Sequence, residues 1–314
     1  MPISRIRVAP RVAPRRAPAA LAALVVAVTA ALTLTGCTGT SQDAPAGIQV
    51  VASTNVYGNL ASTVGGKYAN VTSIIDDPAK DPHEYQADAR TQLAVSKAQV
   101  VIENGGGYDD FVGTMLSASG NTKASRIDAV KLSGYDTTVA DFNEHVFYDF
   151  PTVAKVVDAL VAAFEKADPA HSAVFADNGA KLRVALDGLE NSASRLSTAT
   201  AGVGVAITEP VPDYLLAALK VKVVTPKAFS RAIEDGTDAP VGVLQQTLAT
   251  FSSGEAKLLV YNVQTSGAQT DAVLAAAKKA GVPAVPVSET LPSGFDYVEW
   301  QKGVLATIAQ ALGD

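Results

Sequence analysis

Cysteine and histidine are both scarce in this 314-residue chain. The single cysteine, Cys37, excludes a disulfide within the chain. There are three histidines, His83, His145 and His171, and the motifs H-E-x-x-H and G-x-S-x-G are both absent. These absences argue against a secreted hydrolase, and the lack of thiolate ligands argues against a Cu⁺ site.

Aromatic and charged residues are sparse as well. Aromatic side chains make up 6% of the residues and charged ones 18%, whereas 48% are apolar. This composition is typical of a globular protein, and the abundance of Ala, Val and Gly favours small-residue helices packed on β-branched strands. We therefore expect an α/β fold.

Acidic residues are missing from the first 36 positions. Five arginines there precede an apolar run, which ends in Leu34-Thr35-Gly36 directly before Cys37. A basic segment, a short apolar segment and small residues before a cysteine are typical of a secretory signal with a lipobox. We predict a signal peptide at 1–36 and lipid attachment at Cys37, in preference to an ordinary membrane helix, a twin-arginine signal or a buried cysteine.

Without this leader the chain is strongly acidic. The leader holds five of the 25 basic residues, which leaves 20 Lys and Arg against 31 Asp and Glu and a net charge of −11. Such a surface raises the local concentration of cations and does not favour nucleic acid or anionic lipid as a partner. We expect the protein at the extracytoplasmic face of a bacterial cell membrane, attached through the lipid at Cys37 and a flexible tether at 37–47.

Strand and helix patterns alternate along the rest of the chain. The expected strands lie at residues 48–52, 71–75, 99–102 and 126–130 in the first half, and at 203–208, 221–225, 257–262 and 284–287 in the second. This alternation predicts two lobes, each with a parallel β-sheet flanked by helices. Ligands of such sheets bind beyond the carboxyl ends of the strands.

A long helical pattern separates the two halves. Its apolar stripe from Phe175 to Leu196 has spacings of 7, 4, 3, 4 and 3. A helix of some 30 residues spans roughly 45 Å, enough to run along both lobes. We predict an amino-terminal lobe at 48–167, a linking spine helix at 168–200 and a carboxy-terminal lobe at 201–314.

Two of the histidines stand among oxygen donors. His83 lies in D-P-H-E-Y after the second expected strand, and His145 lies in an acidic and aromatic segment before a helix start. Glu209 and Glu289 directly follow expected strands of the second half, so both should emerge at the carboxyl edge of that sheet. A single glutamate at such a position is usually solvated, and a metal site requires these four side chains to converge.

A glycine-rich turn, N-G-G-G-Y, follows the third expected strand and ends at Tyr108. It satisfies neither the dinucleotide-binding pattern nor the P-loop pattern, so a tight strand-to-helix turn beside a cleft is favoured over phosphate binding. Tyr108 is a candidate to line that cleft. Asp149, expected near the N-cap of the next long helix, is a second candidate.

Together these segments resemble the cluster A-I (cluster 9) family of metal-binding solute-binding proteins, the extracytoplasmic receptors of manganese and zinc ABC importers. The resemblance covers essentially all of the chain after the leader, in the family's order and spacing. It rests on the lipobox, the segments around His83, Tyr108 and His145, the long helix, and the sequence S-E-T-L-P that contains Glu289.

The resemblance implies that His83, His145, Glu209 and Glu289 bind the metal, and that a monomeric receptor delivers the ion to an ABC permease. Phe147 stands where many members have Trp, which changes the packing near His145. No histidine-rich acidic loop lies between the first two ligands, and Glu209 occupies a position where zinc-dedicated members often have a third histidine. Both features resemble manganese-type receptors.

The donor set suits Mn²⁺ or Zn²⁺ as the transported ligand. Two neutral imidazoles and two carboxylates neutralise a dication and so limit the cost of burying it. Imidazole disfavours Ca²⁺ and Mg²⁺, and bidentate carboxylates raise the coordination number above the four that Zn²⁺ prefers, which favours Mn²⁺ slightly. The general order of affinities, in contrast, favours Zn²⁺.

Two other functions fit the same scaffold. A secreted metal-dependent hydrolase needs an open position on the metal and a base, and no unused histidine stands near the proposed ligands. A surface adhesin has no sequence signal of its own here. We expect a binding protein rather than an enzyme, with a spine helix that limits hinge motion to small adjustments.

Overall fold

The computed structural model describes residues 47–77, 85 and 88–313, and its first half forms a parallel four-stranded sheet. The strands are β1 (Ile48–Thr54), β2 (Ala69–Ile75), β3 (Val100–Glu103) and β4 (Ser125–Asp128), in the order β2-β1-β3-β4. The strand expected at 126–130 ends at Asp128, because the side chain of this residue accepts a hydrogen bond from the Lys131 N–H and caps a short helix.

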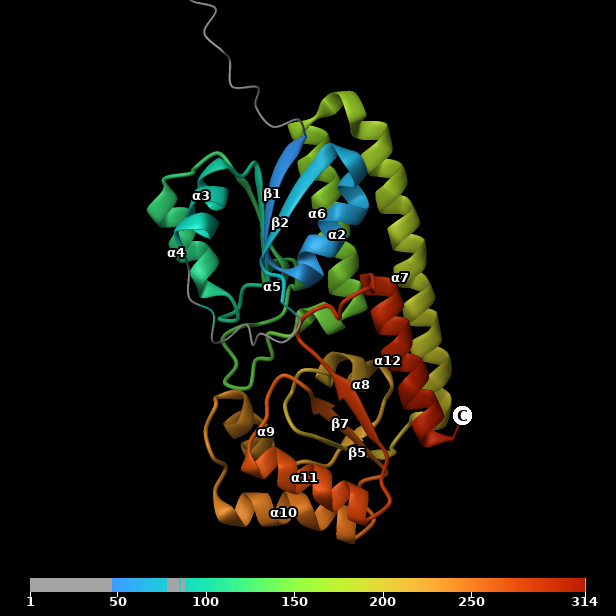
Figure 1. Ribbon diagram of the computed structural model, residues 1–314. Helices are drawn as coiled ribbons and strands as arrows, with labels where there is room; N and C mark the ends of the chain where they lie inside the picture. The colour runs from blue at the N-terminus through green and yellow to red at the C-terminus, as the bar shows by residue number, and fades with distance from the viewer. Residues whose placement is uncertain (1–46, 78–84, 86–87, 314) are drawn as a thin grey trace, which may run out of the picture. The chain divides into compact units, whose positions relative to one another are not determined.

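Helices cover both faces of this sheet. They are α2 (Asn55–Gly65), α3 (Ala89–Lys97), α4 (Asp110–Ser119), α5 (Ala129–Ser133) and α6 (Phe150–Ala167). Figure 1 shows α3 and α4 on one face of the sheet and α2 and α6 on the other. The central strands β1 and β3 are consequently almost entirely buried, as continuous apolar runs in a parallel sheet should be.

The second half repeats this design. Its strands are β5 (Gly204–Ile207), β6 (Lys222–Val223), β7 (Leu258–Asn262) and β8 (Ala284–Val287), all parallel in the order β6-β5-β7-β8. Its helices are α8 (Asp213–Ala218), α9 (Lys227–Glu234), α10 (Val241–Ser252), α11 (Ala268–Lys279) and α12 (Tyr297–Leu312). The edge strand β6 is shorter than the expected 221–225, and α9 is a helix that the sequence patterns did not predict.

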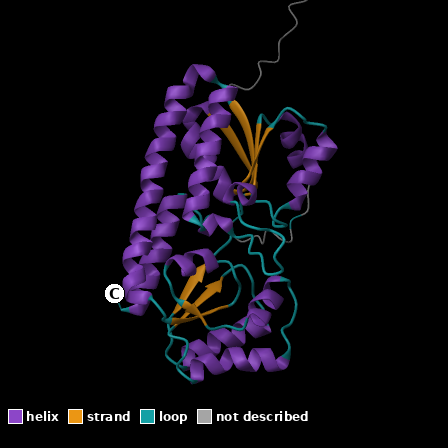
Figure 2. Cartoon of the chain, turned by 180° about the vertical axis from the view of Figure 1, so that it is seen from behind, coloured by secondary structure: helices purple, strands orange, loops and turns teal. Residues whose placement is uncertain are grey.

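One helix of 29 residues, α7 (Ser172–Thr200), links the two halves. It packs against α2 and α6 of the first half and against α8 and α12 of the second, and Figure 2 shows it from behind, passing both sheets. Its buried face is the predicted stripe from Phe175 to Leu196. The predicted fold class, two parallel-sheet lobes joined by a long helix, is confirmed.

The helices α6 and α7 approach closely at Gly179. A Cβ atom at this position would lie 2.3 Å from Cγ2 of Val161, so only glycine fits without a shift. In the part of the chain with assigned structure, none of the helices has the length and apolar character needed to cross a membrane.

Candidate metal centre

Three polar side chains lie at the carboxyl edge of the second sheet. Asn262 is the last residue of β7. Glu209 and Glu289 come after the ends of β5 and β8, each separated from its strand by a single residue. In the parallel register Ile207 pairs with Val260, and Asn262 pairs with Val287, so these strand ends are neighbours. Adjacent parallel strands therefore bring the three side chains to one place, as the sequence predicted for the two glutamates.

The amide of Asn262 links the two carboxylates. Its Nδ2 donates to Oε2 of Glu209 at 2.5 Å and to Oε1 of Glu289 at 2.8 Å. All three residues are buried, with exposures of 2–3%. Two like charges are thus held side by side away from water, an arrangement that requires a compensating cation or proton.

His145 approaches this pair from the first half of the chain. It precedes a single 3₁₀ turn at Val146–Tyr148 and is completely buried. Its Nε2 lies 3.5 Å from Oε2 of Glu289, and its ring makes edge contacts with Tyr108 and Phe147, each with centroids 5.7 Å apart. The structure thus brings together three of the four predicted ligands.

The other ring nitrogen of His145 is held by Asn143. Oδ1 of Asn143 accepts from the His145 backbone N–H at 3.0 Å and lies 2.7 Å from Nδ1, while Nδ2 donates to the Pro210 carbonyl at 2.8 Å. The backbone N–H of His145 and the carbonyl of Pro210 fix which end of the Asn143 amide is the oxygen. Because this oxygen can only accept a hydrogen bond, Nδ1 must carry the proton. In the neutral ring this leaves the lone pair on Nε2, which faces Glu289.

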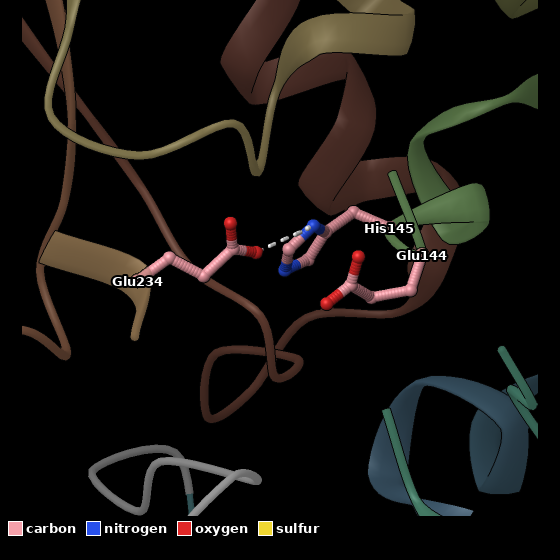
Figure 3. Close-up of side chains that lie close together, drawn as sticks. All are labelled: Glu144, His145 and Glu234. Carbon is pink, nitrogen blue, oxygen red and sulfur yellow. Dashed lines mark ion pairs between the residues drawn. The ribbon is translucent and has the colours of Figure 1, made fainter. Parts of the chain in front are cut away.

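A second group of acidic side chains surrounds the histidine. Figure 3 shows Glu234, from α9, and Glu144, beside His145 in the same loop; ligand atoms of the three residues lie within 4.8 Å of one another. Oε1 of Glu234 is 3.6 Å from Nδ1 of His145. Arg231 Nη1 lies 3.0 Å from Oε2 of Glu234 and 3.9 Å from Oε2 of Glu144, so one guanidinium forms ion pairs with both carboxylates.

Burial and charge shift the pKa values of this cluster in opposite ways. Burial alone lowers the pKa of His145, but its hydrogen bond to Glu289 and the negative charges of Glu289, Glu234 and Glu144 raise it to about 9. Burial raises the pKa of Glu209, against hydrogen bonds from Thr265 and Asn262. Burial also raises the pKa of Glu234, to about 7. The cluster is short of positive charge, which is the electrostatic condition for binding a cation.

The two residues predicted to line the cleft differ in their contacts. Tyr108 is buried and packs on His145, at the end of a turn in which Gly105, Gly106 and Gly107 all have positive φ. Asp149 caps α6, where its carboxylate accepts from the backbone and hydroxyl of Thr152. Two further predictions, His83 as a ligand and Cys37 as the lipid site, lie outside the described residues.

The sequence patterns did not predict four residues of the cluster: Asn143, Glu144, Glu234 and Asn262. Asn262 carries the signal that identified the two glutamates, since it is a polar residue at the end of an apolar strand. Asn143 and Glu234 carry no such signal. Glu234 comes to His145 because α9 lies beside the 141–145 loop, through contacts between residues almost 90 positions apart.

The fold and the cluster together define a class: two parallel-sheet lobes on a linking helix, with buried imidazole and carboxylate groups between them. The family model described as "ZnuA: Zinc-uptake complex component A periplasmic" matches residues 50–311, and the chain belongs to this family. The resemblance found in the sequence is therefore confirmed.

Individual relatives agree with this assignment. The manganese-binding lipoprotein MntA of Bacillus subtilis (strain 168) is 30% identical over 163 residues, 50% of this chain and 53% of that protein. The chain thus matches about half the length of its curated relatives.

Two solved structures share the fold. The periplasmic zinc-binding protein TroA from Treponema pallidum has a TM-score of 0.72 at 17% identity, covering 85% of this chain and 100% of that one. The solute-binding protein FpvC from Pseudomonas aeruginosa in complex with Mn²⁺ has a TM-score of 0.68 at 22% identity, covering 85% and 98%.

Proposed function

We propose that this protein is the receptor of a metal importer, which captures Mn²⁺ or Zn²⁺ between its lobes and delivers the ion to an ABC permease. The observation that carries the proposal is the buried approach of His145 to Glu289, at 3.5 Å, beside the amide that links Glu289 to Glu209. Atoms that share one metal ion lie about this far apart, since each is roughly 2.0–2.2 Å from the ion.

In this proposal four side chains bind the ion: His83, His145, Glu209 and Glu289. Two imidazoles and two carboxylates give a divalent ion a neutral set of ligands, which makes its burial tolerable. Asn143 supports the assignment of Nε2 as the donor atom of His145, because it occupies the Nδ1 proton. The Mn²⁺ complex of FpvC and the manganese-binding relative MntA support Mn²⁺ as cargo, and the zinc-binding protein TroA supports Zn²⁺.

Calorimetry on the purified, chelator-stripped protein tests the site. The wild type should bind one Mn²⁺ or one Zn²⁺, and His145→Ala and Glu289→Ala should weaken binding of both by at least about tenfold. His171→Ala is the matched control, because His171 pairs with Asp168 and stacks on Tyr68 away from the cluster. A wild type that binds neither metal, or ligand variants that bind as well as the control, would refute the proposed site.

We further propose that the receptor is monomeric and is anchored to the extracytoplasmic face of the cell membrane. Residues 1–36 act as the signal peptide, Cys37 carries the lipid, and 37–47 form the tether to the lobes at 48–167 and 201–314, with the spine at 168–200. The lipoprotein name of the relative MntA supports this anchor. Cys37→Ser should move the protein from the membrane fraction to the soluble fraction, and retention of the variant on the membrane would argue against the lipid anchor.

We infer binding without catalysis. Four protein ligands leave a small divalent ion such as Zn²⁺ without an open position for a reactive water, and H-E-x-x-H is absent from the sequence. Ester and peptide substrates should remain intact in the presence of the metal-loaded protein. Hydrolysis that depends on the metal and disappears in His145→Ala would contradict this.

A further inference from the structure

Glu234 has no part in the four-ligand site, yet it lies against one of its ligands. Its side chain is 7% exposed, and Oε1 is 3.6 Å from Nδ1 of His145. Within the described part of the chain, this oxygen has no hydrogen-bond donor. A buried carboxylate oxygen without a donor is costly unless a cation or a proton compensates it. The position is therefore suited to a cation.

The second oxygen of Glu234 is firmly held. Arg231 Nη1 lies 3.0 Å from Oε2, and Nη2 of the same guanidinium donates to the carbonyls of Asp141 at 3.0 Å and Phe142 at 2.8 Å. These carbonyls belong to the loop that carries His145. The arginine thus connects α9 to this loop. Figure 3 shows the Glu234 carboxylate beside the imidazole of His145.

We propose that Glu234 is a further ligand of the transported ion and favours Mn²⁺ over Zn²⁺. The inference rests on the proposed function, because it concerns the same ion. An additional carboxylate oxygen takes the number of ligands beyond the four that Zn²⁺ prefers. Oxygen ligands suit Mn²⁺, for which imidazole and carboxylate sites of higher coordination number are favourable. Ligand atoms of Glu234, His145 and Glu144 lie within 4.8 Å of one another, a spacing that one ion can bridge.

The charges agree with this assignment. Glu209, Glu289, Glu234 and Glu144 contribute four negative charges when ionised, and Arg231 contributes one positive charge. A divalent ion then reduces the net charge of the group from −3 to −1, and so compensates most of the negative charge that is costly to bury. The charge that remains is shared with Glu144, whose side chain is 15% exposed.

Glu234→Gln tests the inference, since it keeps the size of the side chain and removes its charge. Glu255→Gln is the matched control, because Glu255 is 47% exposed and pairs with Lys222 on the surface. Calorimetry with the full purified protein in detergent should show Mn²⁺ binding weakened by about tenfold or more in Glu234→Gln, Zn²⁺ binding by less than about threefold, and neither changed in the control.

A crystal structure of the Mn²⁺-loaded wild type provides a test without a variant. A Glu234 oxygen should lie about 2.2 Å from the ion, the usual metal–carboxylate distance. An oxygen outside bonding distance, or equal weakening of both metals in Glu234→Gln, would overturn the inference and leave the four-ligand site intact. A wild type that binds neither metal would instead overturn the proposed function, and this inference with it.

Discussion

The two ring nitrogens of His145 have different environments. Nδ1 lies against the oxygen of Asn143, and Nε2 faces Glu289. A histidine that binds metal through one nitrogen usually donates its other N–H to an oxygen, which fixes both tautomer and ring orientation. Asn143 also donates to the carbonyl of Pro210, next to Glu209, so one side chain positions groups from both lobes.

Removing Asn143 should therefore weaken metal binding without removing a ligand. In Asn143→Ala the imidazole loses its acceptor at Nδ1, and we expect an affinity for Mn²⁺ and Zn²⁺ about 10- to 100-fold below that of the wild type. Nitrogen NMR of the zinc-loaded protein should show a proton on Nδ1 of His145 in the wild type, and the chain has only three histidines to assign. Affinity within twofold of the wild type would contradict the positioning role of Asn143.

Asp109 provides a pH-dependent contribution to stability away from the candidate ligands. Burial raises its pKa to about 6, although hydrogen bonds from the Asn104 and Gly105 N–H groups favour the ionised form. The folded state therefore binds this proton more tightly than the unfolded chain does. The stability due to this group is present at low pH and is lost as pH rises from about 4 to about 6.

Asp109→Asn should remove this dependence. Between pH 4 and pH 7 the variant should gain up to about 3 kcal/mol relative to the wild type, because a shift of one pKa unit corresponds to 1.36 kcal/mol. Urea unfolding at both pH values measures the difference. A difference between wild type and variant that is the same at both pH values would show that Asp109 does not titrate in this range.

Some residues of the cluster are positioned by the ends of strands and can be predicted from the sequence. Others are positioned by tertiary contacts and cannot. Glu209 and Glu289 follow from a local rule, because parallel strands end at a common edge and the apolar runs mark those ends. The same rule includes Asn262. Glu234 does not follow from it, since its approach to His145 depends on a short helix and on contacts of Arg231 with a distant loop. Tertiary contacts of this kind leave no periodic signal in one sequence.

At the scale of elements, the long helices are better predicted than the short ones. The apolar stripe of α7 extends over more than five turns, so its buried face is evident from the sequence. The helix α9 has eight residues, of which Phe229 and Ile233 are buried apolar side chains. Two such positions are too few to distinguish a helix from a loop, and the helix is stabilised by packing instead.

The contact between α6 and α7 can be tested with two glycines of the same helix. In Gly179→Ala the new methyl group meets Val161, so unfolding should become about 1–3 kcal/mol easier. Gly188 lies on the exposed face of α7 with no atom near its missing Cβ, and Gly188→Ala should stabilise the protein by up to about 1 kcal/mol. Urea unfolding of both variants provides the comparison. If both variants changed the free energy of unfolding equally, α6 would be able to move away from the new methyl group of Gly179→Ala without loss of stability.

At the scale of the whole described unit, the two lobes share one apolar core and are joined by several hydrogen bonds. One apolar cluster includes residues of both sheets and of α7. The side chain of Asn55, at the start of α2, both donates to the carbonyl and accepts from the N–H of Leu291, at 2.9 and 2.8 Å. The hydroxyl of Tyr297 donates to the Phe147 carbonyl, and that of Tyr148 donates to the Ser288 carbonyl.

These links oppose a wide opening of the lobes, because it would break buried hydrogen bonds and expose apolar surface. We therefore expect metal-free and metal-loaded protein to have nearly the same radius of gyration, roughly 18 Å for a compact unit of this size. Small-angle X-ray scattering before and after chelation, with His145→Ala as the variant that should not respond to metal, measures the change. A metal-dependent decrease of more than about 1 Å, which is typical of hinge closure, would show that α7 permits a large domain motion. Metal would then be enclosed by rotation of the lobes, and not by movement of side chains and loops around a nearly fixed site.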